Sequence, residues 1–259
     1  MRNFYLIFKK EFKSYFASPV AYVVITMFLI LTGYFFYNSL ALFSTISFQA
    51  TMNPMLAKQV GLLNITESVV RPLFGNISII LLLMVPLLTM RLFSEEKKSG
   101  TIELLLTYPV TDMGILLGKF FACMAVFIIM IALTILYPLL IIAFGQPEIG
   151  PIITGYIGLF LVGASFVSLG IFASSLTENQ IIAATVAFGL LLLFWMISFS
   201  ASLAGQTLGD ILSYISLTAH LEGFAKGVID TTDIVYYLIF ISLFLFLTLR
   251  ILESKKWRG

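Results

Sequence analysis

Six long apolar runs, separated by short polar segments, constrain this chain more than any other feature. A helix needs about 17–25 apolar residues to cross the hydrocarbon core of a bilayer. Hydrophobic residues make up 60% of the sequence and charged residues 11%, against about 45–50% and 25% in soluble domains. We therefore predict an all-α integral membrane protein of one domain (1–259), with transmembrane helices at residues 20–43, 74–90, 113–144, 152–176, 181–203 and 234–252.

The positions of lysine and arginine predict how the chain is oriented. Cytoplasmic segments of membrane proteins carry an excess of these residues. With both termini inside, 12 of the 15 basic residues fall in cytoplasmic segments, and only Lys58, Arg71 and Lys226 fall outside. The inner positive charge suits anionic lipid headgroups, so no nucleic acid is needed to explain it. We expect an N-in, C-in topology.

The densest cluster of charge lies between the second and third spans, in a loop that we place at 91–112. Charged side chains cost about 2.5–3.5 kcal/mol each at the centre of a membrane helix, so residues 95–98 should lie outside the hydrocarbon. We expect a charged turn, then a short amphipathic helix over 102–107 that ends before Pro109. Thr111 is a candidate N-cap for the third span.

The order of residues in this loop follows a pattern: Glu96-x-x-x-Gly100-Thr101-x-Glu103-x-Leu105-Leu106, then Pro109-Val110 and Gly118-Lys119. The pattern resembles the first cytoplasmic loop of ABC-2-type transporter permeases, which is the coupling helix that docks on the ATPase subunit. The resemblance implies ATPase-coupling roles for Glu95, Glu96, Gly100, Thr101, Glu103, Leu105, Leu106 and Pro109. It also implies a second, smaller contact at Glu178 and Asn179, between the fourth and fifth spans.

The same resemblance extends over nearly the whole chain and implies a function. The chain would be the permease subunit of an ATP-binding-cassette transporter in the bacterial cytoplasmic (inner) membrane. It would pair with a second permease copy, identical or different, and with a separate pair of ATPase subunits. This chain would be non-catalytic and bind no cofactor, because ATP and Mg would sit on the ATPase. Export is the usual direction in the family.

The N-terminal residues resemble one subgroup of these permeases. Residues 8–16, with Ser18-Pro19 and residues 21–23, are similar to permeases of gliding-motility transporters and of nitrous-oxide-reductase maturation. An additional membrane or periplasmic component often accompanies such permeases. The resemblance therefore implies a further possible partner.

An amphipathic helix is expected over residues 1–19, before the first span. Aromatic residues, Phe12 among them, recur on one face, while Lys9, Lys10 and Lys13 lie elsewhere. Aromatic side chains toward acyl chains and lysines toward headgroups are typical of an interfacial helix. The alternative is a positively charged flank that only fixes topology, and the two interpretations are compatible.

Three features inside the spans carry structural expectations. Pro86 and Pro138 should kink the second and third spans, because proline lacks the backbone donor. The small residues of the fourth span favour close helix packing over lining a substrate path. Lys119 is interpreted as a side chain that snorkels toward the inner interface.

The segment 204–233 is too polar to span a membrane but apolar enough to enter the outer leaflet as short re-entrant helices. In the resembled family such half-helices form an outer lid, which implies lid roles for His220, Glu222, Gly223 and Phe224. A metal site normally needs three or four ligands. For His220 we therefore favour capping a half-helix and expect no metal.

Two rival functions are weighed against the permease. A membrane-embedded enzyme needs converging catalytic side chains, and the sequence shows none; Gly118-Lys119 also lacks the remainder of a phosphate-binding loop. A non-transporting scaffold or assembly subunit of a larger complex would have no transport cycle and would not copurify with a stoichiometric ATPase. No aspartate, glutamate, arginine or histidine lies in mid-span, which argues against an ion-coupled carrier.

Overall fold

The computed structural model describes residues 2–52, 64–101, 111–203 and 205–256, and nearly all of these are helical. The elements are α1 (Arg2–Ala17), α2 (Pro19–Met52), η1 (Thr66–Val70), α4 (Arg71–Thr89), α5 (Arg91–Lys98), α7 (Asp112–Thr134), α8 (Leu136–Phe144), α9 (Ile149–Leu176), α10 (Gln180–Leu203), α11 (Gln206–Ile215), α12 (Leu217–Ala225) and α13 (Thr231–Lys256). Within the described ranges, six helical segments are long and apolar enough to cross a membrane. This confirms the all-α class and the six candidate spans.

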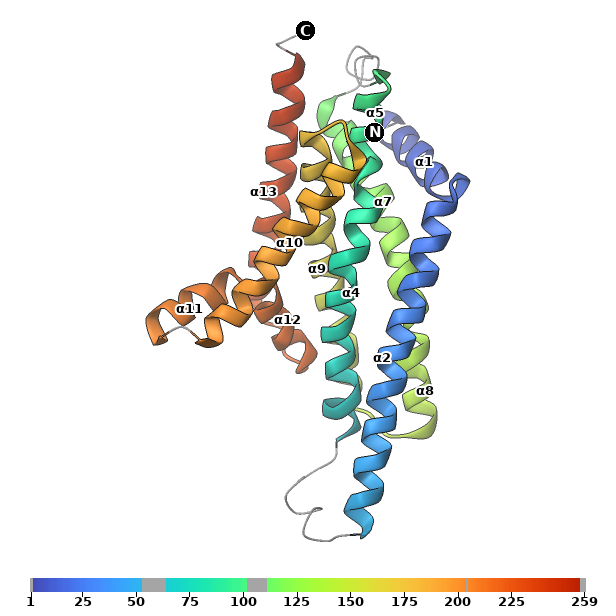
Figure 1. Cartoon of the computed structure of the whole chain (residues 1–259), viewed down its shortest axis with the longest axis vertical. Coiled ribbons are helices and arrows are strands. Elements are labelled where there is room, and N and C mark those ends of the chain that lie inside the picture. Colours follow the sequence, from blue (N-terminus) through green and yellow to red (C-terminus); the bar gives the residue numbers. More distant parts are fainter. Residues whose placement is uncertain (1, 53–63, 102–110, 204, 257–259) are drawn as a thin grey trace.

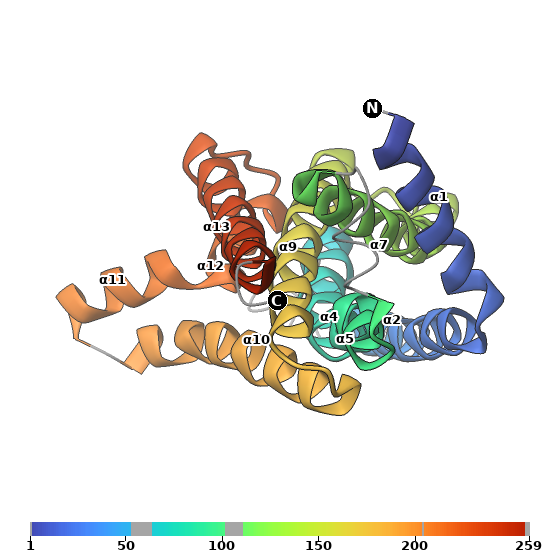
Figure 2. The same ribbon diagram turned by 90° about the horizontal axis from the view of Figure 1, so that it is seen from above.

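Helix α9 is the centre of the bundle. Figure 2 shows it in the middle, with α4, α7, α10 and α13 around it, and these helices pack against it. Helix α2 lies outside α4 and α7 and packs on both. Most of α9 is buried, whereas α2, α10 and α13 expose large apolar side chains on their outer faces. The core therefore forms around the helix that is richest in small residues.

Glycines on α9 let its neighbours approach closely. A Cβ atom at Gly163 would lie 1.8 Å from the ring of Phe127 in α7, and one at Gly155 would lie 2.1 Å from the ring of Phe74 in α4. Gly170 faces α4 in the same way. Small residues allow helices to pack at short distance, so these contacts confirm the expected packing role of the fourth span.

Two helix boundaries differ from the expected spans. Helix α2 continues to Met52 instead of ending near residue 43, and at 1.5 Å per residue it is about 51 Å long, well beyond the hydrocarbon thickness of about 30 Å. The third span is interrupted at Ile135, where α7 gives way to α8. Pro138 cannot donate to the carbonyl of Thr134, which confirms the expected kink. Pro86 remains inside α4, and the helix is interrupted only at Met90.

Figure 1 shows α1, α5 and the last turns of α13 at the same end of the molecule, which we call the α5 end. Helix α11 projects sideways from the other end of α10, and α12 leads back to the bundle, where it packs against α9. Two groups of candidate residues are thereby separated along the bundle: those around α5, and those around α12.

Candidate functional site at the junction of α1, α5 and α7

Helix α1 lies across the α5 end and packs along the start of α7. Gly118 of α7 makes the approach possible, since a Cβ there would lie 2.8 Å from Ile7. Phe12 packs against the core of the protein, and Tyr15 is buried completely. Tyr15 therefore does not face acyl chains, because the protein covers it, whereas Phe12 is half-buried and its expected contact with lipid stays a prediction. Lysines 9, 10 and 13 are exposed.

Tyr15 fixes α1 to the helix pair α4 and α5. Its hydroxyl donates to the carbonyl of Leu88 at 2.8 Å, and the guanidinium of Arg91 lies 4.4 Å above its ring. Burial raises the pKa of Tyr15 well above its ordinary value, so the phenol keeps the proton that it donates. A cation over an aromatic face adds electrostatic attraction.

The charged residues 95–98 after the second span form a helix, and the expected turn is confined to residues 99–101. Helix α5 spans Arg91–Lys98, and Ser174 of α9 supports its first turn. The Ser174 hydroxyl accepts from the backbone N–H groups of Phe93 and Ser94 at 3.0 and 3.2 Å and donates to the carbonyl of Met90 at 2.8 Å. N–H groups at the start of a helix need such partners, which explains why the polar segment is helical.

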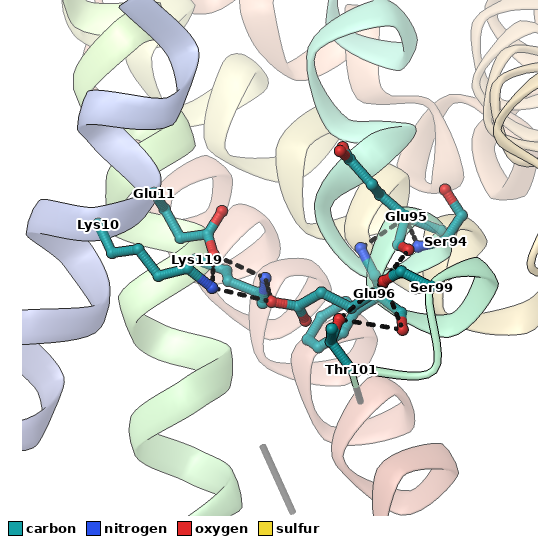
Figure 3. Close-up of polar contacts among 10 residues, drawn as sticks. Lys10, Glu11, Ser94, Glu95, Glu96, Ser99, Thr101 and Lys119 are labelled. Atoms are coloured by element: carbon teal, nitrogen blue, oxygen red, sulfur yellow. Dashed lines mark hydrogen bonds and ion pairs between the residues drawn. The ribbon is translucent and has the colours of Figure 1, made fainter. Parts of the chain in front are cut away.

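A buried lysine joins three helices in this region. The ammonium group of Lys119 in α7 lies 3.0 Å from Oε1 of Glu11 in α1 and 2.9 Å from Oε1 of Glu96 in α5, as Figure 3 shows. Its side chain is only 1% exposed, so the interpretation of Lys119 as a snorkelling residue is wrong. We call Glu11, Glu96 and Lys119 the buried triad.

Charge in the buried triad is balanced by a fourth residue. Lys10, itself mostly exposed, lies 3.7 Å from Glu11 and 3.5 Å from Glu96. The contact between Lys119 and Glu96 is an ion pair without hydrogen-bond geometry, and both Glu96 oxygens lack a hydrogen-bond partner among the described residues. A polar cavity of about 200 Å³ adjoins them. Ion pairing alone therefore stabilises the Glu96 carboxylate in this buried position.

The chain turns directly after α5, at residues 99–101. Gly100 has a φ of +68°, a conformation that costs other residues about 1–2 kcal/mol. The Ser99 hydroxyl lies 2.8 Å from that of Thr101, and Thr101 also donates to the Glu96 carbonyl at 3.4 Å. Glu95, Gly100 and Thr101 are exposed, whereas Glu96 is buried. The candidate residues Glu103, Leu105, Leu106 and Pro109 lie outside the described residues.

The turn between α9 and α10 lies beside α5. Lys97 donates to the backbone carbonyl of Ser175, which ties α5 to the end of α9. Glu178 and Asn179 are exposed in the turn, and the Asn179 side chain accepts from the backbone N–H of Ile181 at 2.9 Å. Asn179 thus caps α10. The structure brings the described part of both candidate coupling segments to one end of the bundle.

Several contacts that hold this junction did not follow from the sequence patterns: those that Glu11, Tyr15, Arg91, Ser174 and Lys119 make with distant residues. One signal was present, because Lys119 is a charge at the start of an apolar run and a buried charge requires a partner. The expected N-cap at Thr111 is confirmed, since its hydroxyl accepts from the backbone N–H of Gly114 at 3.2 Å.

The second group of candidate residues joins α12 to its neighbours. Nδ1 of His220 lies 2.6 Å from Oδ1 of Asp233 in α13, and Nε2 lies 3.0 Å from the carbonyl of Tyr214 near the end of α11. Both ring nitrogens therefore face acceptor oxygens of neighbouring helices. The ring also stacks on Tyr236, with centroids 4.0 Å apart. His220 thereby links α11, α12 and α13.

Helix α12 also rests directly on α9. The Thr154 hydroxyl donates to the carbonyl of Phe224 at 2.6 Å, and the buried Phe224 side chain packs where Gly158 leaves space. Gly223 faces Asp233. Glu222 is exposed and lies 3.5 Å from Lys226. Three of the four candidate lid residues thus contact α9, α11 or α13, and Glu222 is mostly exposed.

Replacing Asp233 by alanine is expected to loosen α11 and α12. The change removes one of two acceptors of His220, and hydrogen bonds to charged groups contribute about 1.5–3 kcal/mol. Backbone hydrogen–deuterium exchange over residues 206–225 should become faster by roughly one to two orders of magnitude, as that free energy implies. Glu222→Ala, which removes an exposed carboxylate from the same helix, is the control and should leave exchange within about twofold.

Comparison with known proteins identifies a transporter family, in agreement with the six candidate membrane spans. Residues 5–257 match the family model described as ABC-2 family transporter protein. None of the curated proteins matches the sequence. The family match covers the junction of α1, α5 and α7, the six candidate spans and the group around His220.

Proposed function

Because the chain belongs to the ABC-2 transporter family, and is therefore a multi-pass membrane subunit of an ABC transporter with an ATPase partner, we propose that the α5 end is where the ATPase docks. The supporting observation is the convergence of α5, residues 99–101 and the α9–α10 turn at one end of the bundle. The docking surface would comprise exposed Glu95, Gly100 and Thr101, the adjoining segment 102–110, and Glu178.

The proposed complex contains two permease copies, identical or different, and a pair of ATPase subunits that bind ATP and Mg. It lies in a bacterial cytoplasmic membrane, with the α5 end inside and the group around His220 outside. This chain binds no cofactor and catalyses no reaction. The start of α1 is similar to gliding-motility and nitrous-oxide-reductase-maturation permeases, which favours an additional membrane component as a partner.

The proposed cycle is driven by closure of the ATPase pair. Closure would move the turn at Gly100 together with the turn at Glu178, and the two turns are joined through Lys97 and Ser175. Helix α9 then carries the movement along the bundle to α12, which it contacts through Thr154 and Phe224. Movement of α11 and α12 switches access across the membrane, and the direction that we propose is export.

A pair of substitutions at Gly100 tests the docking assignment. No atom lies within 4 Å of a Cβ built there, so Gly100→Val perturbs the backbone turn without a clash. Valine at positive φ costs about 1–2 kcal/mol, so we expect roughly five- to thirtyfold less transport-coupled ATP hydrolysis in the purified complex. Asparagine tolerates positive φ better than valine does, so Gly100→Asn should retain most of the transport-coupled ATP hydrolysis. Equal coupling in both variants and the wild type would contradict the assignment.

A further inference from the structure

A cavity of about 580 Å³ lies between α4, α10 and α12, away from the α5 end. Its volume is within the range of about 300–1,000 Å³ that is typical of small-molecule sites. The residues that carry the argument are Arg71, Asn76, Trp195, Ser198, Phe199 and Lys226. They come from the first turns of α4, the second half of α10 and the end of α12, so three elements form one concave surface.

Two cations face this cavity with weak partners. Nη2 of Arg71 lies 3.6 Å from Glu67, and Nζ of Lys226 lies 3.5 Å from Glu222. All four side chains are substantially exposed, and exposed pairs of this kind contribute little. Glu222 lines the cavity but Glu67 does not, so the lining carries a net positive charge of one. A bound anion could therefore replace Glu67 on the guanidinium and form the stronger bidentate contact.

Besides the two cations, the wall of the cavity contains both uncharged polar side chains and apolar ones. Asn76, Ser198 and the Trp195 indole lie in candidate spans, and none of the three side chains donates a hydrogen bond to another residue in the described part of the chain. Ile79 and Phe199 supply apolar wall. Polar groups at membrane depth are costly without partners, which favours a ligand that has both a polar and an apolar part.

We propose that this cavity binds an amphiphile with an anionic, phosphate-like headgroup, held by Arg71 and Lys226, and with its hydrocarbon part along Trp195 and Phe199. The proposal rests on the proposed function only for the statement that the cavity faces outward. The ligand of the cavity is a lipid of the surrounding leaflet or a transported amphiphile, and both combine an anionic headgroup with a hydrocarbon part.

The sequence supplies its own fluorescent reporter. Trp195 and Trp257 are the two tryptophans of the chain, so Trp257→Phe leaves the cavity residue as the sole tryptophan, which is excited selectively above the tyrosine absorption band. The purified permease in neutral detergent is titrated with bromododecyl phosphate, whose bromine quenches a nearby indole, and separately with uncharged bromododecyl maltoside. We expect saturable quenching by the phosphate and only a linear, non-saturable decrease with the maltoside. Equal quenching by the two probes would overturn the proposal.

Gly75 allows the cavity to be filled without a clash. It lines the cavity, and no atom lies within 4 Å of a Cβ built there, so Gly75→Leu should weaken phosphate binding at least tenfold while the protein folds normally. Gly189→Leu, on α10 and equally free of neighbours, is the matched control and should bind as before. Arg71→Gln should also weaken binding at least tenfold. Unchanged affinity in Gly75→Leu and Arg71→Gln would refute the site.

A second cavity substitution, Ser198→Leu, covers the case in which Gly75→Leu fails to fold. It should weaken phosphate binding by the same tenfold, and thermal unfolding checks that the variant is folded.

Vesicles with the assembled transporter distinguish the two sources of ligand. If ATP displaces the bound phosphate probe, the ligand is a transported amphiphile; if the probe remains bound, it is a lipid. Because the titration uses the permease alone, its outcome is independent of whether the ATPase docks at the α5 end.

Discussion

Lys119→Met is expected to destabilise the protein by about 3–5 kcal/mol, the usual cost of removing one partner from a buried ion pair. The substitution leaves the carboxylates of Glu11 and Glu96 close together and mostly buried, with the exposed Lys10 within 4 Å of both. Methionine nearly preserves the volume, so the loss would report charge and not packing. Reversible unfolding in mixed detergent micelles, followed by circular dichroism, measures the change.

Two further variants distinguish the effect of charge on stability from the effect of side-chain shape. In the triple variant Glu11→Gln, Glu96→Gln, Lys119→Met no charge of the triad remains, and most of the lost stability should return, because neutral replacement of a whole buried network is often tolerated. Lys10→Met should cost less than about 1 kcal/mol, since Lys10 is exposed and such pairs contribute little. If Lys119→Met unfolded at the wild-type denaturant concentration, the triad would have no stabilising role.

Gly163→Leu is expected to have the second large effect. A Cβ at this position would lie 1.8 Å from the Phe127 ring, so α7 and α9 would have to separate. Overpacking a core costs about 1–3 kcal/mol and occasionally more, and here the displaced element is a complete helix. We expect a lower midpoint of thermal unfolding and a low yield of folded protein in detergent.

A compensating substitution tests that explanation. Phe127→Ala alone should cost about 3–5 kcal/mol through the cavity that it leaves. The double variant with Gly163→Leu fills part of that cavity and should be more stable than Phe127→Ala alone. Gly189→Ala, at a helical glycine with no neighbour within 4 Å, should be neutral or slightly stabilising. A double variant less stable than both single variants would contradict direct contact.

Local patterns predicted the features of the fold that depend on nearby residues. The six candidate spans follow from apolar length, the interruption at Ile135 follows from Pro138, and the cap at Thr111 follows from the residue types around it. Packing through Gly163 was expected from the small residues of its helix. Each of these features is determined by a short stretch of sequence.

Features that depend on distant partners could not be predicted from such patterns. The helical state of the charged residues 95–98 could not be predicted, because Ser174, which supports the first N–H groups of α5, lies 81 positions after Phe93. The aromatic face of α1 was assigned to lipid because a helical period does not distinguish acyl chains from a protein surface such as α7. The pairing of Lys119 with Glu11 spans 108 positions, and the local patterns that contain the two residues do not indicate that they meet.

That separation of 108 positions also bears on how the protein is made. A ribosome adds about 5–20 residues per second, so Glu11 is added to the chain about 5–20 s before Lys119. Until then the N-terminal helix lacks the buried partner of its Glu11 carboxylate and the contacts that it makes with α7. Nascent chains halted before residue 119 should therefore keep this helix accessible to lipid or chaperones, and release of the third span should be the event that withdraws it.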